Sequence, residues 1–171
     1  KLSNNIKFQD YRKVNGLYDK IVSIEMFEAV GKKDWSTYFK TIGKCLKNNG
    51  IAALQIITIN EEGYSSYEKN KDFIQKYIFP GGMLPTKSLL KKFAIKNNLI
   101  IEEKRSFGED YARTLRIWRR NFLSKWDNIK KLGYDEEFKR LWEYYLCYCE
   151  LGFKVGTIDV SQFKIKKTNH V

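Results

Sequence analysis

The sequence predicts an α/β fold with a largely parallel sheet, and three observations support this prediction. Two segments, Tyr18–Ile24 and Ile51–Ile59, are short runs of apolar and β-branched residues, as buried strands are. Between them, apolar side chains recur at three- and four-residue steps over Asp34–Leu46, which indicates an amphipathic helix. A strand, a helix and a second strand in this order form a βαβ unit, whose strands are parallel and whose crossover is right-handed.

The first segment of the chain is polar and rich in turn residues over positions 1–17, except for a possible short strand at Ile6–Phe8. The β-branched run of Tyr18–Ile24 predicts a buried strand. The helix that follows is interrupted by Asn48-Asn49-Gly50, a strong turn signal. The next strand, IAALQIITI, is apolar almost throughout, which is typical of a parallel strand covered on both faces.

The middle of the chain has a different character. Residues Tyr64–Tyr77 are polar with scattered aromatic side chains and predict one or two short helices. The segment Ile78–Pro85, IFPGGMLP, holds both prolines of the chain and is predicted to be a rigid loop. Thr86 has the features of a helix N-cap, because an apolar helical face follows it. Leu99–Lys104 is predicted to be a strand that becomes polar toward its end.

The last third of the chain predicts two long helices and a final strand. Glu109–Asp127 and Asp135–Phe153 each carry a stripe of aromatic and aliphatic side chains at helical spacing. Thr157–Lys166 alternates apolar and polar residues and is predicted to complete the sheet. No repeat, low-complexity segment or internal domain boundary is visible, so a single domain is expected for 171 residues.

Composition and charge narrow the function classes. The chain has 43% hydrophobic residues, which is a globular composition, and no apolar run approaches the length of a membrane span. Its 32 lysine and arginine residues give a net charge of +12, which favours an anionic partner or a solvated basic surface. No secretory signal opens the sequence, and its three cysteines, an odd number, indicate a reducing cytoplasm. Cys147, Cys149 and His170 lack the spacing of a zinc site, so no metal is expected.

No Gly-x-Gly sequence occurs in the chain, although open α/β sheets usually bind nucleotide-like cofactors with a glycine-rich first turn. Either the protein binds no such cofactor, or the segment that binds it lies outside this sequence. The stretch DKIVSIEMFEAVG, in contrast, places Glu25 and Glu28 where the first strand ends. An acid at such a position is commonly a helix N-terminal residue stabilised by the helix dipole, and less often a catalytic group.

Longer motifs give the sequence a family resemblance. The segments YDKIVSIEMFEAVG, YFKTIGKCLKNNGIAALQIITI, FIQKYIFPGGMLP, FGEDYARTLRIWRRNF and WEYYLCYCELGFKVGTIDVSQFKI resemble the cyclopropane-fatty-acyl-phospholipid synthases. Their relatives are the mycolic acid cyclopropane synthases and other S-adenosylmethionine-dependent lipid methyltransferases. The likeness runs from about Phe8 to Lys166, and motifs of this length discriminate better than any short pattern.

The resemblance implies a Rossmann-like class I methyltransferase fold. The match covers only the second half of the family's catalytic domain, so residues 1–171 are expected to be the C-terminal portion of a single domain whose first βα units are missing. The glycine-rich turn for S-adenosylmethionine would lie before this portion. We therefore expect the isolated chain to bind no cofactor and to be inactive. The strand Tyr18–Ile24 would then have an unpaired edge, through which the chain is expected to dimerise or aggregate.

The implied reaction gives the acids a role. The family transfers a methyl group from S-adenosylmethionine to the cis double bond of an unsaturated phospholipid acyl chain, and a base then removes a proton from the resulting cation. Bicarbonate is the implied base, and Glu28 matches the family's acid that helps to hold this ion. A dry site protects the cation from water. Glu25 is expected to be a structural or cofactor-proximal acid.

Other site residues follow from the resemblance one position at a time. Gln55 falls where many members have histidine, Ile57 would offer its backbone to the bicarbonate, and the Tyr111 hydroxyl would point at the same ion. Each also has a structural interpretation, as a strand residue or a core residue. Gln9 and Asp10 lie where members contact the cofactor's adenine. Cys149 matches a cysteine proposed as nucleophile or base, although a buried cysteine on an apolar stripe is commonly inert.

Two departures bear on the product. Gln55 cannot titrate near neutral pH as histidine does, and Ala29 replaces a histidine found in many members. A methyl-branched or methylene lipid is therefore an alternative to a cyclopropane ring. Two other function classes remain as alternatives. One is a methyltransferase that acts on a small amine or polyketide-like substrate. The other is a non-enzymatic basic module that binds nucleic acid, but no nucleic-acid motif supports it.

The partners implied by the resemblance are lipids. Unsaturated phospholipid acyl chains are the expected substrate, and the enzyme is expected to be cytoplasmic and peripherally associated with the inner face of the membrane. Basic residues of the helix Glu109–Asp127 have two interpretations, either a solvated face or a contact with anionic headgroups. They are Arg113, Arg116, Arg119 and Arg120.

Overall fold

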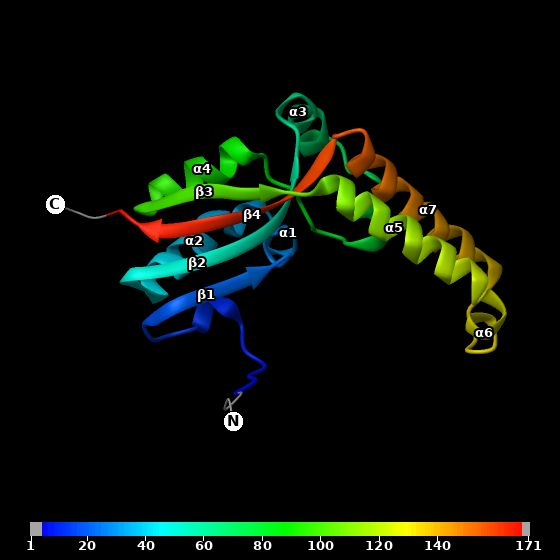
Figure 1. The fold of residues 1–171 in the computed structure, drawn as a ribbon, viewed down its shortest axis with the longest axis horizontal. Helices are drawn as coiled ribbons and strands as arrows, with labels where there is room; N and C mark the ends of the chain where they lie inside the picture. Colours follow the sequence, from blue (N-terminus) through cyan, green and yellow to red (C-terminus); the bar gives the residue numbers. More distant parts are fainter. Residues whose placement is uncertain (1–4, 169–171) are drawn as a thin grey trace.

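A mixed four-stranded sheet forms the centre of the molecule (Figure 1). The structure is a computed structural model that describes residues 5–168. The strands, in chain order, are β1 (Tyr18–Ile24), β2 (Leu46–Ile59), β3 (Leu99–Ser106) and β4 (Ile158–Lys167). They are arranged in the order β1-β2-β4-β3. β1 and β2 are parallel, as the βαβ pattern predicts, whereas β4 is antiparallel to both of its neighbours.

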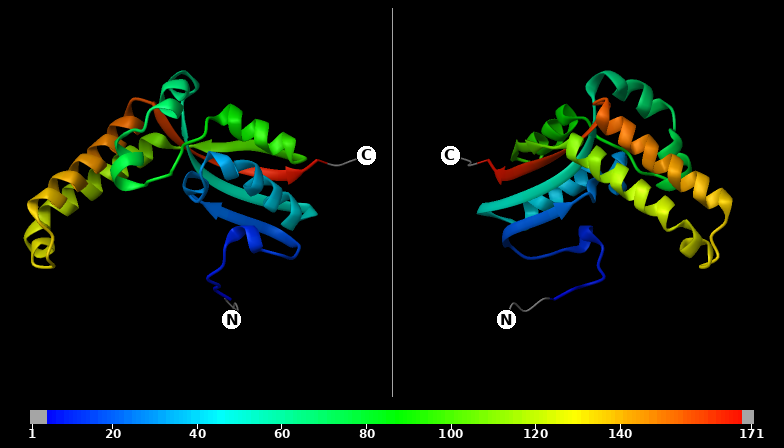
Figure 2. Two further views of the ribbon diagram at one scale, coloured as in Figure 1. Left: turned by 180° about the vertical axis from the view of Figure 1, so that it is seen from behind. Right: turned by 45° about the vertical axis from the view of Figure 1, so that its right-hand side comes forward.

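The helices form two groups. α1, α2 and α4 lie along one face of the sheet, whereas α5 and α7 pack side by side and project away from its end (Figures 1 and 2). None of the described helices is long and apolar enough to cross a membrane. The helical elements are η1 (Tyr11–Lys13), α1 (Phe27–Val30), η2 (Lys32–Asp34), α2 (Trp35–Cys45), α3 (Glu61–Lys69), the π-helical turn η3 (Ile74–Ile78), α4 (Lys87–Lys96), α5 (Gly108–Ser124), α6 (Trp126–Lys130) and α7 (Glu136–Lys154).

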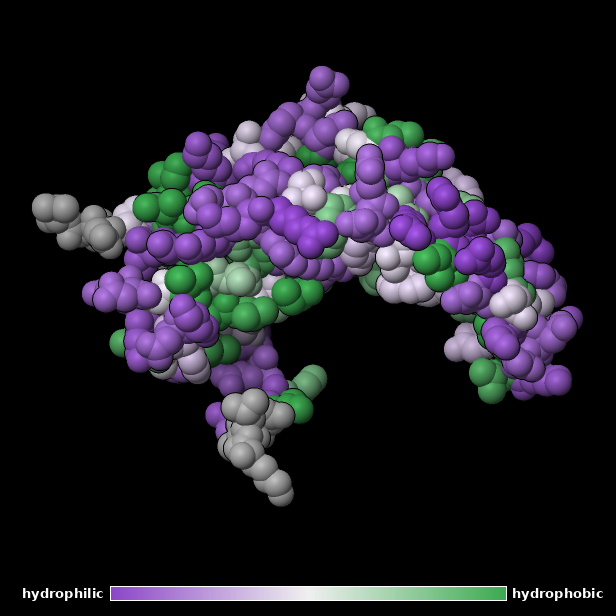
Figure 3. Space-filling model, in the orientation of Figure 1, coloured by the Kyte–Doolittle hydropathy of each residue, from purple (hydrophilic) through white to green (hydrophobic). Residues whose placement is uncertain are grey.

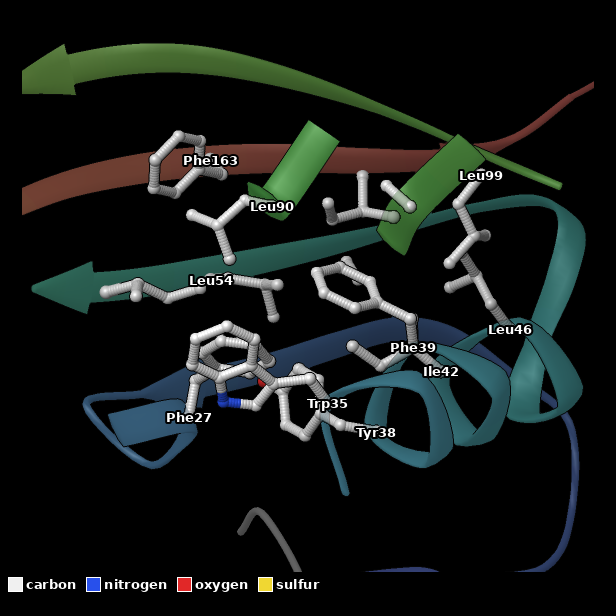
Figure 4. Packing of buried hydrophobic residues seen from close by; sticks show 14 residues of the cluster. Phe27, Trp35, Tyr38, Phe39, Ile42, Leu46, Leu54, Leu90, Leu99 and Phe163 are labelled. Carbon is white, nitrogen blue, oxygen red and sulfur yellow. The ribbon is translucent and has the colours of Figure 1, made fainter. Parts of the chain in front are cut away.

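The main core lies between the sheet and the layer formed by α1, α2 and α4 (Figure 4). Its centre is aromatic, because Phe27 of α1 packs against the rings of Trp35, Tyr38 and Phe39 with centroid separations of 5.3, 4.9 and 5.6 Å. Leu54 from β2 and the side chains of the other strands close it from the sheet side. α1 is only four residues long, so this burial of Phe27 fixes its position.

A second, smaller core joins the α5–α7 pair to β4. Leu115, Leu146, Phe153 and Val160 are buried there, and Trp142 and other partly buried side chains pack around them. The apolar stripes that predict the two long helices therefore face each other. This confirms the amphipathic pattern as a packing signal.

On the opposite face of the sheet, α5 and α7 cover only the region where Ile57 of β2 and Val160 of β4 lie, and no helix covers β1 within the described residues. Val22 and Ile24 of β1 are 68% and 56% exposed, and hydrophobic side chains gather over β1 and β2 on this face (Figure 3). The prediction that Tyr18–Ile24 is buried is therefore wrong for this chain, although its bounds are correct. Burial of a strand depends on what covers it, and β1 has a neighbouring strand on one side only.

Other departures are local. Ile6–Phe8 forms no strand, and its residues are exposed. β2 alternates between buried and more exposed residues from Ile51 to Thr58, since one face is covered fully by the main core and the other only in part. The helix predicted over Glu109–Asp127 is interrupted near Lys125, where α5 ends and α6 begins. Thr86 caps α4 as predicted, since its hydroxyl accepts a hydrogen bond from the Leu89 N–H.

Candidate active site

Polar side chains meet where β1 and β2 end at the same edge of the sheet. Ile24 is paired with Gln55, and the Glu25 N–H extends this ladder by donating to the Gln55 carbonyl over 2.8 Å. Carboxyl ends of parallel strands are where α/β folds place their ligand sites. The register therefore brings Glu25, Gln55 and the nearby Glu28 together.

The Glu25 carboxylate is the centre of one hydrogen-bond network. Its Oε1 accepts from the Gln55 Nε2 at 2.7 Å, and its Oε2 accepts from the Tyr111 hydroxyl at 2.8 Å. The Gln55 Oε1 in turn accepts from the Gln162 Nε2 at 3.2 Å, which orients the amide so that its N–H group faces Glu25. Three elements thus fix one carboxylate: β2, β4 and α5.

Glu28 occupies a drier position beside this network. Its Oε1 accepts a 2.5 Å hydrogen bond from the Ile57 N–H, while its Oε2 is buried and has no hydrogen-bond partner among the described residues. Burial raises the pKa of the Glu28 carboxyl from 4.5 to about 7, against the lowering effect of the Ile57 N–H, and the neighbouring charge of Glu25 adds to the rise. Glu28 can therefore exchange a proton near neutral pH.

The backbone around Glu28 is held from two sides. Phe27 anchors α1 in the aromatic core, and the Glu28 carbonyl accepts from the Met83 N–H at 2.9 Å. Met83 belongs to the proline- and glycine-rich loop, which Gln75 fixes further by donating from its Nε2 to the Gly82 carbonyl at 3.0 Å. The loop that the sequence predicts to be rigid thus holds the backbone of Glu28 in place.

Tyr111 is positioned by the start of α5. The Asp159 carboxylate on β4 accepts from the Gly108 N–H at 3.1 Å, which ties the first turn of the helix to the sheet. A Cβ atom on Gly108 would lie 2.8 Å from the Asp159 Oδ1, so a larger residue there would displace the carboxylate that anchors the helix. The Tyr111 ring packs on Phe153 at a centroid distance of 4.8 Å. Burial and the hydrogen bond to Glu25 raise the pKa of the Tyr111 phenol, so it remains a proton donor.

An open cavity of about 430 Å³ gives access to this network. Both side chains that donate to Glu25 line it, together with Arg105, Phe107 and Trp118. Its lining combines aromatic rings with polar side chains, which include Asp110, Thr114 and Gln162. Such a pocket suits a largely apolar ligand that reacts at one point.

The arrangement supports chemistry on a cationic centre. Two carboxylates and a phenol face one region, and the ring of Tyr111 could stabilise a nearby positive charge as well as donate a hydrogen bond. Glu28 supplies a group that titrates near pH 7, and Glu25 supplies a hydrogen-bonded carboxylate. The site can therefore stabilise a cation and accept a proton from it.

Cys149 lies outside this network. It packs among the apolar side chains between α5 and α7, where burial raises the pKa of its thiol to about 12. A thiol that remains protonated at neutral pH is a poor nucleophile and a poor base. The structure thus gives Cys149 the environment of a packing residue.

Gln9 and Asp10 are also separate from the network. Gln9 is exposed, and its Nε2 donates to the Lys13 carbonyl at 2.8 Å. Asp10 caps the short η1 and forms an ion pair with Arg12 at 2.7 Å, and the hydrogen bonds from Arg12 lower the pKa of Asp10 to about 2. No described contact joins either residue to Glu25 or Glu28.

The predicted site residues are thus brought together in part. Gln55, Ile57, Tyr111 and Glu28 do lie in one region, but Gln55 and Tyr111 donate to Glu25 and not to a group held by Glu28. The sequence gives no signal for this pairing, since Glu25 and Tyr111 are 86 residues apart. Gln162 was not predicted to belong to the site. The alternation of apolar and polar residues in its strand does place its side chain on the face of the sheet opposite the main core.

The described residues include no group of three or more His, Cys, Asp or Glu side chains arranged to hold a metal ion. The polar groups in the site are carboxylate, amide and phenol.

Comparisons with known proteins agree with the sequence motifs. The family described as "Mycolic acid cyclopropane synthetase" matches residues 1–163. The chain is 41% identical over 157 residues to tuberculostearic acid methyltransferase UfaA1 of Mycobacterium tuberculosis, a match that covers 91% of this chain and 37% of that protein. It is 38% identical over 162 residues to cyclopropane-fatty-acyl-phospholipid synthase of Escherichia coli, covering 94% of this chain and 41% of that protein.

Solved structures show the same fold. Mycolic acid cyclopropane synthase CmaA1 complexed with SAH and CTAB superposes with a TM-score of 0.82 at 27% identity, covering 92% of this chain and 58% of that one. The sheet is therefore that of a class I methyltransferase, in agreement with the Rossmann-like fold expected from the resemblance. The chain spans about two fifths of the length of the first two relatives that it matches.

Proposed function

This chain belongs to the mycolic acid cyclopropane synthetase family, and from that premise we propose that it forms part of an enzyme that methylates lipid double bonds. The proposed substrate is the cis double bond of an unsaturated phospholipid acyl chain, and S-adenosylmethionine is the proposed cofactor. The observation that supports this best is the convergence of Glu25, Glu28 and Tyr111 beside a cavity whose lining includes three aromatic rings. The relative from Escherichia coli, named for fatty-acyl-phospholipid, supports the substrate class.

Residues 5–168 supply the groups that would act on the lipid substrate. S-adenosylmethionine supplies an electrophilic methyl group, and one solved relative is complexed with SAH, its demethylated form. Gln9 and Asp10 are the residues expected to contact the adenine of the cofactor. Within residues 5–168 the Gln9 amide oxygen accepts no hydrogen bond, whereas the carboxylate of Asp10 is engaged by Arg12. We assign the reacting groups to Glu25, Glu28 and Tyr111, which surround the place where a cation would form.

The identity of the proton acceptor is the second part of the proposal. The sequence resemblance implies a bicarbonate ion beside Glu28, Gln55 and Tyr111. The three donors available for it, which are Gln55 Nε2, the Tyr111 hydroxyl and the Ile57 N–H, already donate to carboxylates of the chain. A further anion would meet two carboxylates, which repel it. The arrangement described here therefore does not fit bicarbonate, and no step is assigned to that ion.

The function is tested by the acyl products of the whole protein. Incubation with S-adenosylmethionine and a phospholipid bearing cis-unsaturated chains should give acyl chains heavier by one CH₂. Loss of the double bond at that mass indicates ring closure, and a retained double bond indicates a methylene product. A saturated methyl-branched chain would be heavier by two more hydrogens and would need a reductant. No change in acyl mass would contradict the proposal.

A methylated, non-cyclised product is the second candidate. The relative with 41% identity is named a tuberculostearic acid methyltransferase, after a fatty acid and not after a cyclopropane. Gln55 also cannot titrate near neutral pH, so it cannot assist ring closure by accepting a proton. The same mass measurement distinguishes the two products.

Peripheral membrane contact is proposed through the exposed face of α5. Arg116 and Arg119 pair with Glu150 on α7 at 2.7 and 3.3 Å, so they serve the helix pair. Arg113 and Arg120 are exposed and form no ion pair within residues 5–168. These two remain available for the anionic headgroups of the cytoplasmic leaflet.

The double variant Arg113→Ala/Arg120→Ala should bind vesicles with anionic headgroups more weakly, by about 1 kcal/mol for each arginine. Co-sedimentation with the vesicles measures this change. The variant Arg116→Ala/Arg119→Ala is the matched control, because both of its arginines are engaged with the Glu150 carboxylate on α7. Equal binding of the wild type to neutral vesicles would contradict the contact.

Self-association through β1 is the last part of the proposal. β1 forms one edge of the sheet, and its backbone is paired on one side only within the described residues. Produced alone, the chain should dimerise or aggregate at micromolar concentration, and Val22→Lys should reduce this, because a charge on an edge strand opposes pairing. Ile100→Lys on β3, which is also exposed, is the control. A monomer in sedimentation velocity would refute the expectation.

A further inference from the structure

Glu25 adopts a backbone conformation that suits its side chain poorly. Its φ is 50°, in the left-handed region that glycine adopts easily and that other residues enter with steric strain. Such strain persists where the surrounding structure enforces it, and it is concentrated at functional sites. A glutamate at a position that glycine would fill without strain indicates that its side chain is required.

The Glu25 carboxylate accepts hydrogen bonds from two side-chain donors of the site. Gln55 and Tyr111 reach its two oxygens at 2.7 and 2.8 Å. Each donor is itself oriented, Gln55 by Gln162 and Tyr111 by its packing on Phe153. Two aligned donors on one carboxylate form a site built for an anion, and here the anion is part of the chain.

The same two donors line the cavity of about 430 Å³, so a ligand in the cavity lies against the Glu25 network. Each oxygen of a carboxylate has lone pairs beyond the one used by its donor. Glu25 can therefore hold its two hydrogen bonds and still accept a proton from a neighbouring molecule.

We propose that Glu25 is a catalytic residue whose carboxylate accepts the proton released in the reaction, so that this enzyme needs no bicarbonate ion. The proposal rests on the proposed function, since it concerns the same lipid substrate. Gln55 and Tyr111 act as positioning residues for this carboxylate.

The step balances without a further reagent. The π electron pair of the double bond forms a bond to the methyl carbon, the sulfur keeps the electron pair of the broken S–CH₃ bond, and a carbocation remains on the lipid. A C–H bond of the new methyl group then breaks. Its electron pair closes the ring, or forms a double bond after a hydride shift within the chain, and its proton goes to Glu25. The resulting carboxylic acid releases the proton to solvent. The methyl hydrogens become acidic as the C–H bonding electrons are drawn toward the cationic carbon, so a carboxylate suffices as the base.

The first test measures anion binding and needs no activity. Carbon-13-labelled bicarbonate is added to the whole protein, and its NMR line width and the thermal unfolding temperature are recorded. The wild type should show no binding, whereas Glu25→Gly should bind bicarbonate, because it frees two donors and relaxes the strained backbone. Glu25→Gly/Tyr111→Phe should lose this binding. Wild-type binding that Tyr111→Phe abolishes would overturn the proposal, as would a Glu25→Gly variant that binds none.

The second test measures product in buffer depleted of carbon dioxide. The wild-type rate should be unchanged within about twofold, and Glu25→Gly should fall about 100-fold or more, the range expected for a lost general base. Added bicarbonate should restore at least about tenfold of the Glu25→Gly rate, whereas Glu25→Gln should stay inactive, because its amide fills the anion position. Glu62→Gln, on the exposed start of α3, is the matched control.

The outcomes separate the two proposals. A wild type that makes no lipid product contradicts the proposed function, while the binding experiment still decides whether Glu25 occupies the anion position. A wild type that makes product only when bicarbonate is added overturns the role of Glu25 and leaves the proposed function intact. Full activity of Glu25→Gln without bicarbonate would also overturn it.

Discussion

The variant Glu28→Gln of the whole protein should lose activity by a factor of about 10²–10³, the range measured when one electrostatic group of an active site is removed. The glutamine oxygen can still accept from the Ile57 N–H, so the local geometry is preserved. The negative charge beside the forming lipid cation is lost. The measurement is the rate of acyl product formation at saturating substrate.

The same variant should be more stable than the wild type at high pH. The pKa of Glu28 is raised from 4.5 to about 7, so the folded protein binds this proton more tightly than the unfolded chain does. The associated stability is present below about pH 4.5 and is lost as the pH rises through 7. At pH 8 Glu28→Gln should therefore raise the free energy of unfolding by about 1–3 kcal/mol, and at pH 4 the difference should vanish.

Loss of activity together with a gain of stability distinguishes a functional acid from a structural one. Wild-type activity should also rise with pH through about 7, while the residual activity of Glu28→Gln should lack this rise. The exposed Glu62→Gln variant should change neither quantity. A Glu28→Gln enzyme that is less stable at pH 8, or as active as the wild type, would contradict the role assigned to Glu28.

The largest effect on folding is expected for Phe27→Ala, which should lower the free energy of unfolding by about 3–5 kcal/mol. Phe27 is fully buried and contacts three aromatic rings, so its removal leaves a cavity in the main core. It also loosens α1, which carries Glu28. Denaturant unfolding of the whole protein measures the change through a shift of the midpoint at constant slope.

Ile95→Ala is the control for this substitution. Ile95 is 60% exposed on α4, so shortening it should change the free energy of unfolding by no more than about 0.5 kcal/mol. If Phe27→Ala cost no more than Ile95→Ala, the aromatic cluster would not be the anchor of α1.

Local signals predicted the elements of the fold well. The bounds of β1 and the N-cap Thr86 are read from a few neighbouring residues, and the structure has both of them. The stripes of α5 and α7 predicted which faces pack, because helical spacing fixes the side of each residue. The exposure of β1 was not predictable, since burial depends on segments distant in the sequence.

The sequence predicted which residues lie in the site, but not which of them are joined by hydrogen bonds. The family resemblance assembled Glu28, Gln55, Ile57 and Tyr111, and all four lie in one region. The network centred on Glu25 depends on a contact across 86 residues and on a positive φ, neither of which a single sequence reveals. An acidic residue after a strand fits a helix N-terminus equally well, so its neighbours in space decide its role.

The central position of β4 has a consequence for biosynthesis. Within the described residues, β3 is paired only with β4, which follows it by more than fifty residues in the chain. While a ribosome is still translating α5 and α7, β3 has no partner strand. The start of α5, the helix that carries Tyr111, then lacks its anchor Asp159, which has not yet been synthesised. The site is therefore assembled only after residues 158–167 have emerged, and nascent chains that stall before them expose an unpaired strand to chaperones.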